Sequence, residues 1–245
     1  MASAENAESM KMFVVEQLAD NVFIFNGDCR EVIPTLEQKI DAVVSDPPYG
    51  IEDLVVGYGR SQLAAVGLHH LNIHNDKNLD VVVEALNLIK AKYNTIWLAL
   101  FYSCRISPVF FQATDMLDYF GEIVWDKKAM GLGSQIRYQH ENVGVFKIGN
   151  PSDLASCSSV LTYMPLKGEQ KTVHPHEKPN QVMHNLCSVV PGQMILDPFM
   201  GTGSTGAAAV QLKRGFVGIE LDPRYFDLAR TKIEAAIKQP VAFWE

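Results

Sequence analysis

The sequence predicts an α/β domain with a mostly parallel, twisted sheet and helices on both faces. Segments with strand composition alternate with segments of helical periodicity along most of the chain, which is the pattern of such folds. The run 41–45 has the apolar character of a strand buried on both faces, as in parallel sheets. With 245 residues and 47% hydrophobic content, the chain can bury a large core, and we expect residues 1–245 to form one domain.

Each expected element rests on its local pattern. Short runs of β-branched and aromatic residues indicate strands, and apolar residues spaced three and four apart indicate helices. In chain order, the pattern predicts a strand at 22–26, a helix at 30–38, a strand at 41–45, a helix at 81–92, a strand at 95–102, a helix at 108–119, a strand pair at 122–126 and 142–147, a helix at 180–189, a strand at 194–197, a helix from about 204 to 215, a strand at 215–220 and a helix from 223.

Two stretches, 51–78 and 149–173, interrupt this alternation and have no clean period. Loops of that length inside a compact domain are usually functional or mobile, so both are candidates for contact with something outside the domain. Residues 1–12 are expected to form a flexible N-terminus.

Composition argues against several classes of protein. The opening residues lack the pattern of a signal peptide and no apolar run reaches membrane-spanning length, so we expect neither secretion nor membrane insertion. The four cysteines are scattered, which favours free thiols in a reducing cytoplasm. The net charge of −7 argues at first against nucleic acid, but residues 1–55 hold 11 acidic and only 3 basic residues. The rest of the chain can therefore still present a neutral or locally basic face to a polyanion.

The predicted strand 41–45 runs into a rigid corner, Asp46-Pro47-Pro48-Tyr49. Both prolines lack a backbone N–H and fix their own φ, and each biases the preceding residue away from helix. The corner therefore presents a carboxylate, backbone carbonyls and an aromatic ring in a set geometry. An ordinary strand-ending turn has a similar composition, so the corner alone does not decide between the two interpretations.

A second signal follows the predicted strand 194–197. Asp197 precedes a glycine-rich turn that leads into a helix, and the spacing of dinucleotide sites is matched by Gly201, Gly203 and Gly206. Glu220, at the end of the next strand, could bind ribose hydroxyls. Taken alone, this pattern fits an NAD-dependent oxidoreductase as well as other proteins with nucleotide-type ligands, or a turn that uses glycine for steric reasons.

Together the two signals resemble the amino-group DNA methyltransferases that use S-adenosylmethionine. That family has one strand ending in Asp-Pro-Pro-Tyr and another ending in Asp-Pro-Phe-x-Gly-x-Gly, as this chain does at 46–49 and 197–203. Four shorter segments also resemble family motifs: Asn-Gly-Asp-Cys at 26–29, Glu-Ile-Val-Trp-Asp-Lys at 122–127, Arg-Tyr-Gln-His-Glu-Asn at 137–142 and His-Pro-His-Glu-Lys-Pro at 174–179. The resemblance covers about residues 22–238, and the catalytic motif precedes the cofactor motif, as in the β group. It implies a Rossmann-like methyltransferase fold with a short recognition insertion.

The resemblance also implies roles for the motif residues. Asp46 and the carbonyl of Pro47 would accept the hydrogen bonds of an exocyclic amine in the corner stiffened by Pro48, and Tyr49 would stack on a base turned out of the duplex. The residues that would bind S-adenosylmethionine are Asp197, Phe199, Gly201, Gly203, Glu220 (at the ribose hydroxyls) and Lys178. Asp28 would help to seat the target base. No metal is expected, because the cofactor carries both the positive charge and the leaving group.

Several interpretations stay open at this point. Asp at the first position of the corner mostly accompanies adenine in this family, so adenine N6 is preferred over cytosine N4. The chain could also be an RNA or protein-amide methyltransferase, a silent DNA-binding relative or an NAD-dependent oxidoreductase, of which the last leaves the corner unexplained.

The expected macromolecular substrate is double-stranded DNA. In the β group, the segment that reads the sequence lies between the His-Glu-Asn strand and the cofactor motif, which leaves only residues 149–173. So short a segment predicts a short or loose recognition site. Lys167 and Lys171 are its candidate phosphate contacts, although both could equally be ordinary solvated surface. A homodimer and a cognate restriction nuclease stay open as partners, and no membrane partner is expected.

Overall fold

The structure is a computed structural model that describes residues 13–50, 79–130, 137–165 and 177–238. The predicted flexible N-terminus, the loop 51–78, and both Lys167 and Lys171 lie outside the described residues. The strands are β1 (Val14–Ala19), β2 (Val22–Asn26), β3 (Ala42–Ser45), β4 (Ile96–Tyr102), β5 (Asp118–Asp126), β6 (His140–Ile148), β7 (Val160–Thr162), β8 (Met194–Asp197) and β9 (Gly215–Glu220). The helices are α1 (Cys29–Thr35), α4 (Asp80–Lys92), the 3₁₀ turn η1 (Cys104–Ile106), α5 (Ser107–Ala113), α6 (Asn180–Val189), α7 (Ser204–Gln211) and α8 (Pro223–Lys238).

These strands form one sheet in the order β1-β2-β9-β8-β3-β4-β6-β5-β7. The central strands, from β2 to β4 in this order, are parallel. By contrast, β1 and β6 run antiparallel to their neighbours, and β5 and β7 pair in parallel. The carboxyl ends of the central strands and the beginning of β6 therefore meet at one edge of the sheet. Ligands bind at this edge in open α/β sheets.

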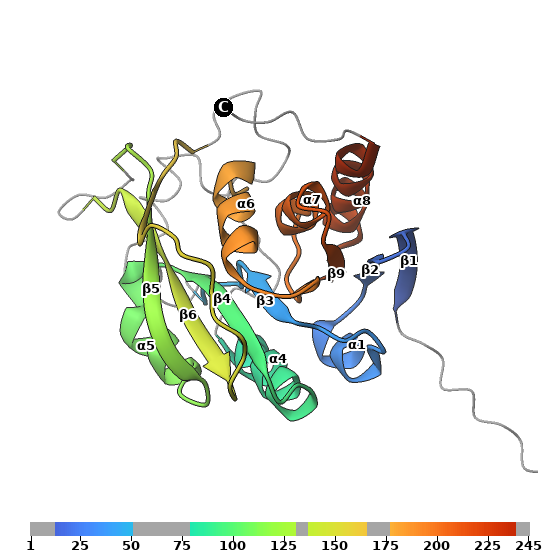
Figure 1. The fold of residues 1–245 in the computed structure, drawn as a ribbon, viewed down its shortest axis with the longest axis horizontal. Coiled ribbons are helices and arrows are strands. Elements are labelled where there is room, and N and C mark those ends of the chain that lie inside the picture. The colour runs from blue at the N-terminus through green and yellow to red at the C-terminus, as the bar shows by residue number, and fades with distance from the viewer. Residues whose placement is uncertain (1–12, 51–78, 131–136, 166–176, 239–245) are drawn as a thin grey trace, which may run out of the picture.

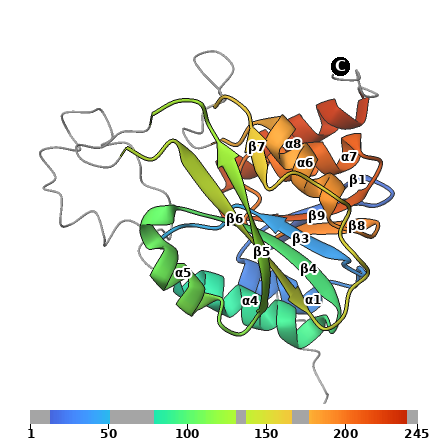
Figure 2. The ribbon, with the colours of Figure 1, turned by 60° about the vertical axis from the view of Figure 1, so that its left-hand side comes forward.

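Helices cover both faces of the sheet (Figures 1 and 2). One layer contains α6, α7 and α8, and the other contains α1, α4 and α5. Every residue of β4 is buried, with Trp97 and Phe101 packed in the first layer and Leu98 and Leu100 in the second. Burial on both faces explains why this strand is apolar throughout instead of alternating with polar residues. The predicted fold class is confirmed.

The bounds of β2, α6, β8 and β9 are those predicted from the sequence. The helix predicted at 108–119 is wrong at its end, because α5 stops at Ala113 and Asp118 already pairs with Lys147 of β6. Thr114 ends α5, and its hydroxyl donates a 2.9 Å hydrogen bond to the carbonyl oxygen of Phe110. Tyr119 then packs edge-on against Phe146, a tertiary contact that outweighs local helical periodicity.

Three further differences concern the ends of two helices and two strands that were not predicted. Helix α1 stops at Thr35, because Leu36 is extended. Helix α7 stops at Gln211 instead of Gly215, since Lys213 adopts a left-handed φ of 57°. The sequence pattern does not predict β1 or β7, the strands at the two ends of the sheet order. Among the described helices, none is long and apolar enough to cross a membrane.

Candidate active site

The two predicted motifs lie side by side because β3 and β8 are parallel neighbours in the sheet. Both strands therefore deliver the residues that follow them to the same edge. Ser45, the last residue of β3, donates a 2.6 Å hydrogen bond from Oγ to Oδ1 of Asp197, the last residue of β8. The corner and the glycine-rich turn, distant in sequence, are thus joined by a direct contact.

The corner after β3 presents its carboxylate at the edge of the sheet. Pro47 is buried, whereas Asp46, Pro48 and Tyr49 are partly exposed. The hydroxyl of Tyr49 donates a 2.8 Å hydrogen bond to Oδ1 of Asp46. Gly50 follows with a left-handed φ of 64°. The Asp46 carboxylate is therefore fixed from one side by an aromatic residue of its own corner.

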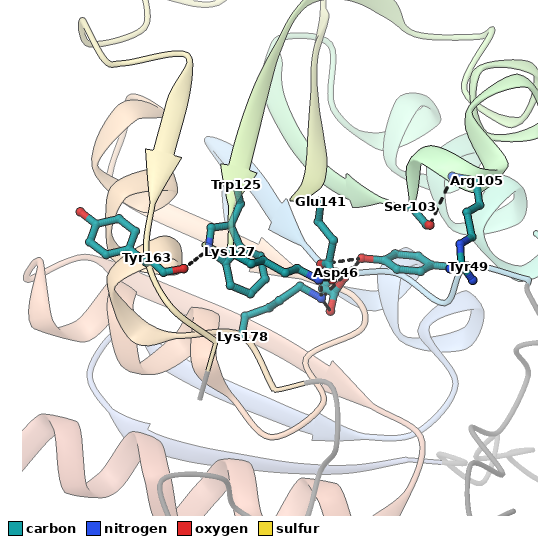
Figure 3. A network of polar contacts seen from close by, with 9 residues as sticks. All are labelled: Asp46, Tyr49, Ser103, Arg105, Trp125, Lys127, Glu141, Tyr163 and Lys178. Carbon is teal, nitrogen blue, oxygen red and sulfur yellow. Dashed lines mark hydrogen bonds and ion pairs between the residues drawn. The ribbon is translucent and has the colours of Figure 1, made fainter. Parts of the chain in front are cut away.

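Three more charged side chains gather at this corner (Figure 3). The Nζ of Lys178 lies 2.5 Å from Oδ2 of Asp46 and 3.1 Å from Oε2 of Glu141. Glu141 comes from the start of β6 and forms a second ion pair with Lys127, which follows β5. The side chain of Lys178 is 6% exposed and that of Glu141 18%. Charges of alternating sign therefore run from the corner to Lys127.

The environment of these groups sets their protonation. Burial would raise the pKa of Glu141, but the ammonium groups of Lys178 and Lys127 outweigh burial and lower it to about 2. Burial would lower the pKa of Lys178, and the carboxylates of Asp46 and Glu141 raise it instead. Burial and the same two carboxylates raise the pKa of Tyr49 well above its usual value. At neutral pH, Lys178 and Glu141 are therefore charged and Tyr49 is a neutral phenol.

Asp197 connects the corner to the turn and to α7. Its side chain is buried, and Oδ1 accepts hydrogen bonds from Ser45 and from the backbone N–H of Phe199, the latter at 3.1 Å. Oδ2 accepts a 2.5 Å hydrogen bond from Oγ1 of Thr205. Burial raises the pKa of Asp197 to about 6, although these hydrogen bonds favour the ionised form.

Glu220 faces the same turn from the end of β9. Its Oε2 accepts a 2.8 Å hydrogen bond from the backbone N–H of Gly201, and its Oε1 accepts a 2.9 Å hydrogen bond from the backbone N–H of Asp222. Burial raises the pKa of Glu220 to about 7. Each carboxylate oxygen can accept a second hydrogen bond, so the residue can also bind hydroxyl groups of a ligand.

Two glycines of the turn serve different purposes. A Cβ on Gly203, which has a φ of 81°, would lie 2.9 Å from Cα and Cβ of Ala229 in α8. A Cβ on Gly201, which has a φ of 53°, would meet no atom within 4 Å. Gly203 therefore permits close packing of the turn on α8, while Gly201 borders open space next to the Glu220 carboxylate. An open turn before a helix, flanked by a carboxylate, fits a nucleoside-type cofactor with ribose hydroxyls.

Comparison with known sequences places this site in a family. The sequence profile of the DNA methylases, which comprise N6- and N4-specific enzymes, matches residues 90–231, more than half of the chain. The chain belongs to this family. The matched range of the methylase contains the glycine-rich turn after Asp197, Glu141 and Lys178, and it begins after the Asp46 corner.

Two relatives show how far the similarity extends. The type II methyltransferase M.HinfI of Haemophilus influenzae is 38% identical over 74 residues, which are 29% of this chain and 21% of that protein. The putative methylase YubD of Escherichia coli (strain K12) is 26% identical over 221 residues, which are 85% of this chain and 88% of that protein. The similarity to M.HinfI is thus local, and the similarity to YubD extends over most of both chains.

Solved structures share the fold of this methylase. The complex of M1.HpyAVI with S-adenosylmethionine has a TM-score of 0.61 and 23% identity, over 85% of this chain and 98% of that one. The PvuII DNA methyltransferase, described as cytosine-N4-specific, has a TM-score of 0.63 and 14% identity, over 90% of this chain and 91% of that one. At these identities, the comparison establishes the fold.

The structure places Asp28 on the side of the site next to Glu220, because Asn26 pairs with Glu220 across β2 and β9. Its carboxylate accepts a 2.9 Å hydrogen bond from the backbone N–H of Arg30 at the start of α1, and the same arginine forms a 2.6 Å ion pair with it. The strand before Asp28, β2, lies three positions from β3 in the sheet. Asp28 therefore caps a helix away from Asp46, and its role in seating the base stays a prediction.

The structure gives Lys178 contacts that the sequence does not predict, and its role in cofactor binding stays a prediction. The ammonium group of Lys178, predicted to bind the cofactor, contacts Asp46 and Glu141. Glu141 and Lys127 lie in segments that resemble family motifs, but the sequence alone does not single them out as site residues. Within the described ranges, no group of three or more His, Cys, Asp or Glu side chains could hold a metal ion. The histidines at 69, 70, 74, 174 and 176 lie outside those ranges.

Proposed function

We propose that this methylase transfers a methyl group from S-adenosylmethionine to the exocyclic N6 amine of adenine in double-stranded DNA. S-adenosylmethionine is the cofactor, and it supplies both the positive charge and the leaving group of the reaction. The protein therefore has to hold the amine and point its lone pair at the methyl group. The observation that carries the proposal is the hydrogen bond from Ser45 to Asp197, because it fixes the Asp46 corner against the cofactor turn.

The corner supplies the groups that such an amine requires. An amino group on an aromatic base is a poor nucleophile, since its lone pair is delocalised into the ring. The Asp46 carboxylate and the Pro47 carbonyl would each accept one N–H, which draws the nitrogen towards tetrahedral geometry and directs its lone pair out of the ring plane. This preference for the transition state over the ground state is what accelerates the transfer.

Tyr49 would change partners when the base enters. In the structure its hydroxyl donates to Oδ1 of Asp46, and its Oη lies 3.4 Å from Oε2 of Glu141. An incoming amine competes with that hydroxyl for Asp46, while the ring offers a face on which the flipped base can stack. The hydroxyl of Tyr49 would thus give up Asp46 to the amine, and its ring would support the base.

The choice of adenine rests on Asp46 at the first position of the corner. Both amines would find the same pair of hydrogen-bond acceptors, and a cytosine-N4-specific enzyme is among the proteins with this fold. To decide, the purified protein is incubated with labelled S-adenosylmethionine and unmethylated duplex DNA, and the modified nucleoside is identified by mass spectrometry. N6-methyladenine is expected. N4-methylcytosine would overturn the base assignment, and labelling of RNA alone would overturn the DNA assignment.

We also propose that DNA is held through the segment 149–173, with Lys167 and Lys171 as phosphate contacts. Replacing both lysines with Ala should weaken binding to all DNA sequences and reduce the salt slope of binding by up to about two units. Binding is measured by fluorescence anisotropy at several salt concentrations. An unchanged slope would place the phosphate contacts elsewhere, and an altered site preference would make these lysines readers of bases.

A further inference from the structure

The ammonium group of Lys178 lies at the centre of the ion pairs at the corner. Besides its two carboxylate partners, Nζ of Lys178 lies 5.0 Å from the ring centre of Phe101 and 5.6 Å from that of Tyr49. Two anions, Asp46 and Glu141, therefore balance two cations, Lys178 and Lys127. The four charges sum to zero next to the cofactor turn.

Lys178 is also held firmly along the chain. The preceding residue, Glu177, has a side chain only 2% exposed and forms an ion pair with Lys232 of α8. Lys232 donates a further 2.9 Å hydrogen bond to Oγ of Ser204, at the start of α7. Pro179 follows directly as the residue before α6. Consecutive residues thus anchor this segment to the cofactor half of the site and to the catalytic corner.

Stability does not explain such a network. Buried ion pairs are on average no more stabilising than apolar residues of the same volume, because desolvation offsets the attraction between the charges. A function of the site does explain it. An ammonium in contact with Asp46 orients its carboxylate, yet on its own it would repel a second cation bound nearby. The methyl donor is such a cation, since its sulfur is a sulfonium, whereas the product is a neutral thioether.

We propose that Lys178 and Glu141 are positioning residues with opposite electrostatic tasks. Lys178 orients the Asp46 carboxylate as an acceptor for the amine. Glu141 cancels the charge of Lys178, so that the site keeps its preference for the cationic methyl donor over the neutral product. This inference rests on the proposed function, because it concerns how the same site treats its cofactor.

The first test compares affinities for S-adenosylmethionine and S-adenosylhomocysteine by calorimetry. In Glu141→Gln, the ratio of the first affinity to the second should fall by about three- to tenfold, and in Lys178→Met it should change in the opposite direction. The matched control is Glu122→Gln, because Glu122 on β5 hydrogen-bonds to the uncharged groups of Tyr102 and Asn142. Its ratio should stay within about twofold of the wild type. Opposite changes in one ratio cannot come from a general loss of structure, which thermal unfolding of each variant checks.

The second test separates the orientation of Asp46 from cofactor binding. Lys178→Met should lower the single-turnover rate of methyl transfer by about tenfold or more at saturating S-adenosylmethionine, because Asp46 loses the ammonium that orients it. Lys178→Arg, which keeps the charge, should restore most of the wild-type rate.

These outcomes separate the inference from the function on which it rests. A wild-type protein that binds neither compound would refute the proposed function. A wild-type protein that binds S-adenosylmethionine and methylates DNA, with unchanged affinity ratios and transfer rates in the variants, would overturn only the tasks assigned to Lys178 and Glu141. If Lys178→Met does not fold, the ratio in Glu141→Gln and the transfer rate of Lys178→Arg still decide.

Discussion

Replacing Asp197 with Asn should stabilise the ligand-free protein at neutral pH. The carboxylate is 2% exposed, and its hydrogen-bond donors are Ser45, Thr205 and the N–H of Phe199. An asparagine has the same shape. Its Oδ1 can accept from Ser45 and Phe199, while its Nδ2 can donate to the Thr205 hydroxyl. The substitution therefore removes a buried charge and keeps the hydrogen bonds.

The magnitude follows from the pKa of Asp197, which is about 6 in the folded protein against 3.8 as the ordinary value. When the pKa of an acid is higher in the folded than in the unfolded state, the protein loses stability as the pH rises from the lower of these two pKa values to the higher. About two pKa units correspond to about 3 kcal/mol in the free energy of unfolding. Roughly half of this loss is present by pH 5 and nearly all of it by pH 8. Asp197→Asn escapes the loss, so its advantage over the wild type should grow across this range.

The assay is urea unfolding of both proteins without cofactor at several pH values between 4.5 and 8. Asp115→Asn, at an exposed position after α5, is the control, and its difference from the wild type should be small and nearly constant. Glu220, whose pKa burial raises to about 7, is present in every protein compared. The small part of that rise that comes from the Asp197 charge disappears in Asp197→Asn and adds to the expected difference in the same direction. Parallel pH curves for the wild type and Asp197→Asn would refute the reasoning, since they would mean that burial does not raise the pKa of Asp197.

Three further predictions concern the corner, the ring and the turn. Asp46→Ala should reduce methyl transfer by about 100-fold or more while cofactor affinity stays nearly intact, whereas Glu220→Ala should weaken cofactor binding by about 1.5–3 kcal/mol. Single-turnover rates measure the first effect and calorimetry the second. An active Asp46→Ala variant would contradict the mechanism. Tyr49→Phe should keep most activity and Tyr49→Ala should lose much more, because stacking of the base on the ring contributes roughly 1–3 kcal/mol. Equal losses of activity would assign the role to the hydroxyl instead. Gly203→Ala should destabilise the protein by about 2 kcal/mol or more, since the new Cβ is strained at φ 81° and meets Ala229, while Gly121→Ala, where a Cβ meets nothing within 4 Å, should cost far less in the same thermal unfolding assay.

Several features of this protein could be predicted because their causes are local. The Asp46 corner is set by two prolines, and the turn after Asp197 is set by glycines, one of which has to pack closely on α8. The apolar composition of β3 and β8 predicts that both strands are buried on both faces. Since parallel strands end at one edge of a sheet, their order along the chain also sufficed to predict that the two motifs lie together.

Other features depend on contacts between distant segments, and only the tertiary structure decides them. Glu141 reaches the corner because β6 runs antiparallel to β4, so that its first residues, and not its last, lie at the edge that carries Asp46. Lys178 pairs with Asp46 while its neighbour Glu177 pairs with Lys232 of α8. The early end of α5 similarly follows from the pairing of Asp118 with Lys147 across β5 and β6. Such pairings leave no periodic trace in the sequence, because an ion pair or a strand register requires only that two side chains meet in space.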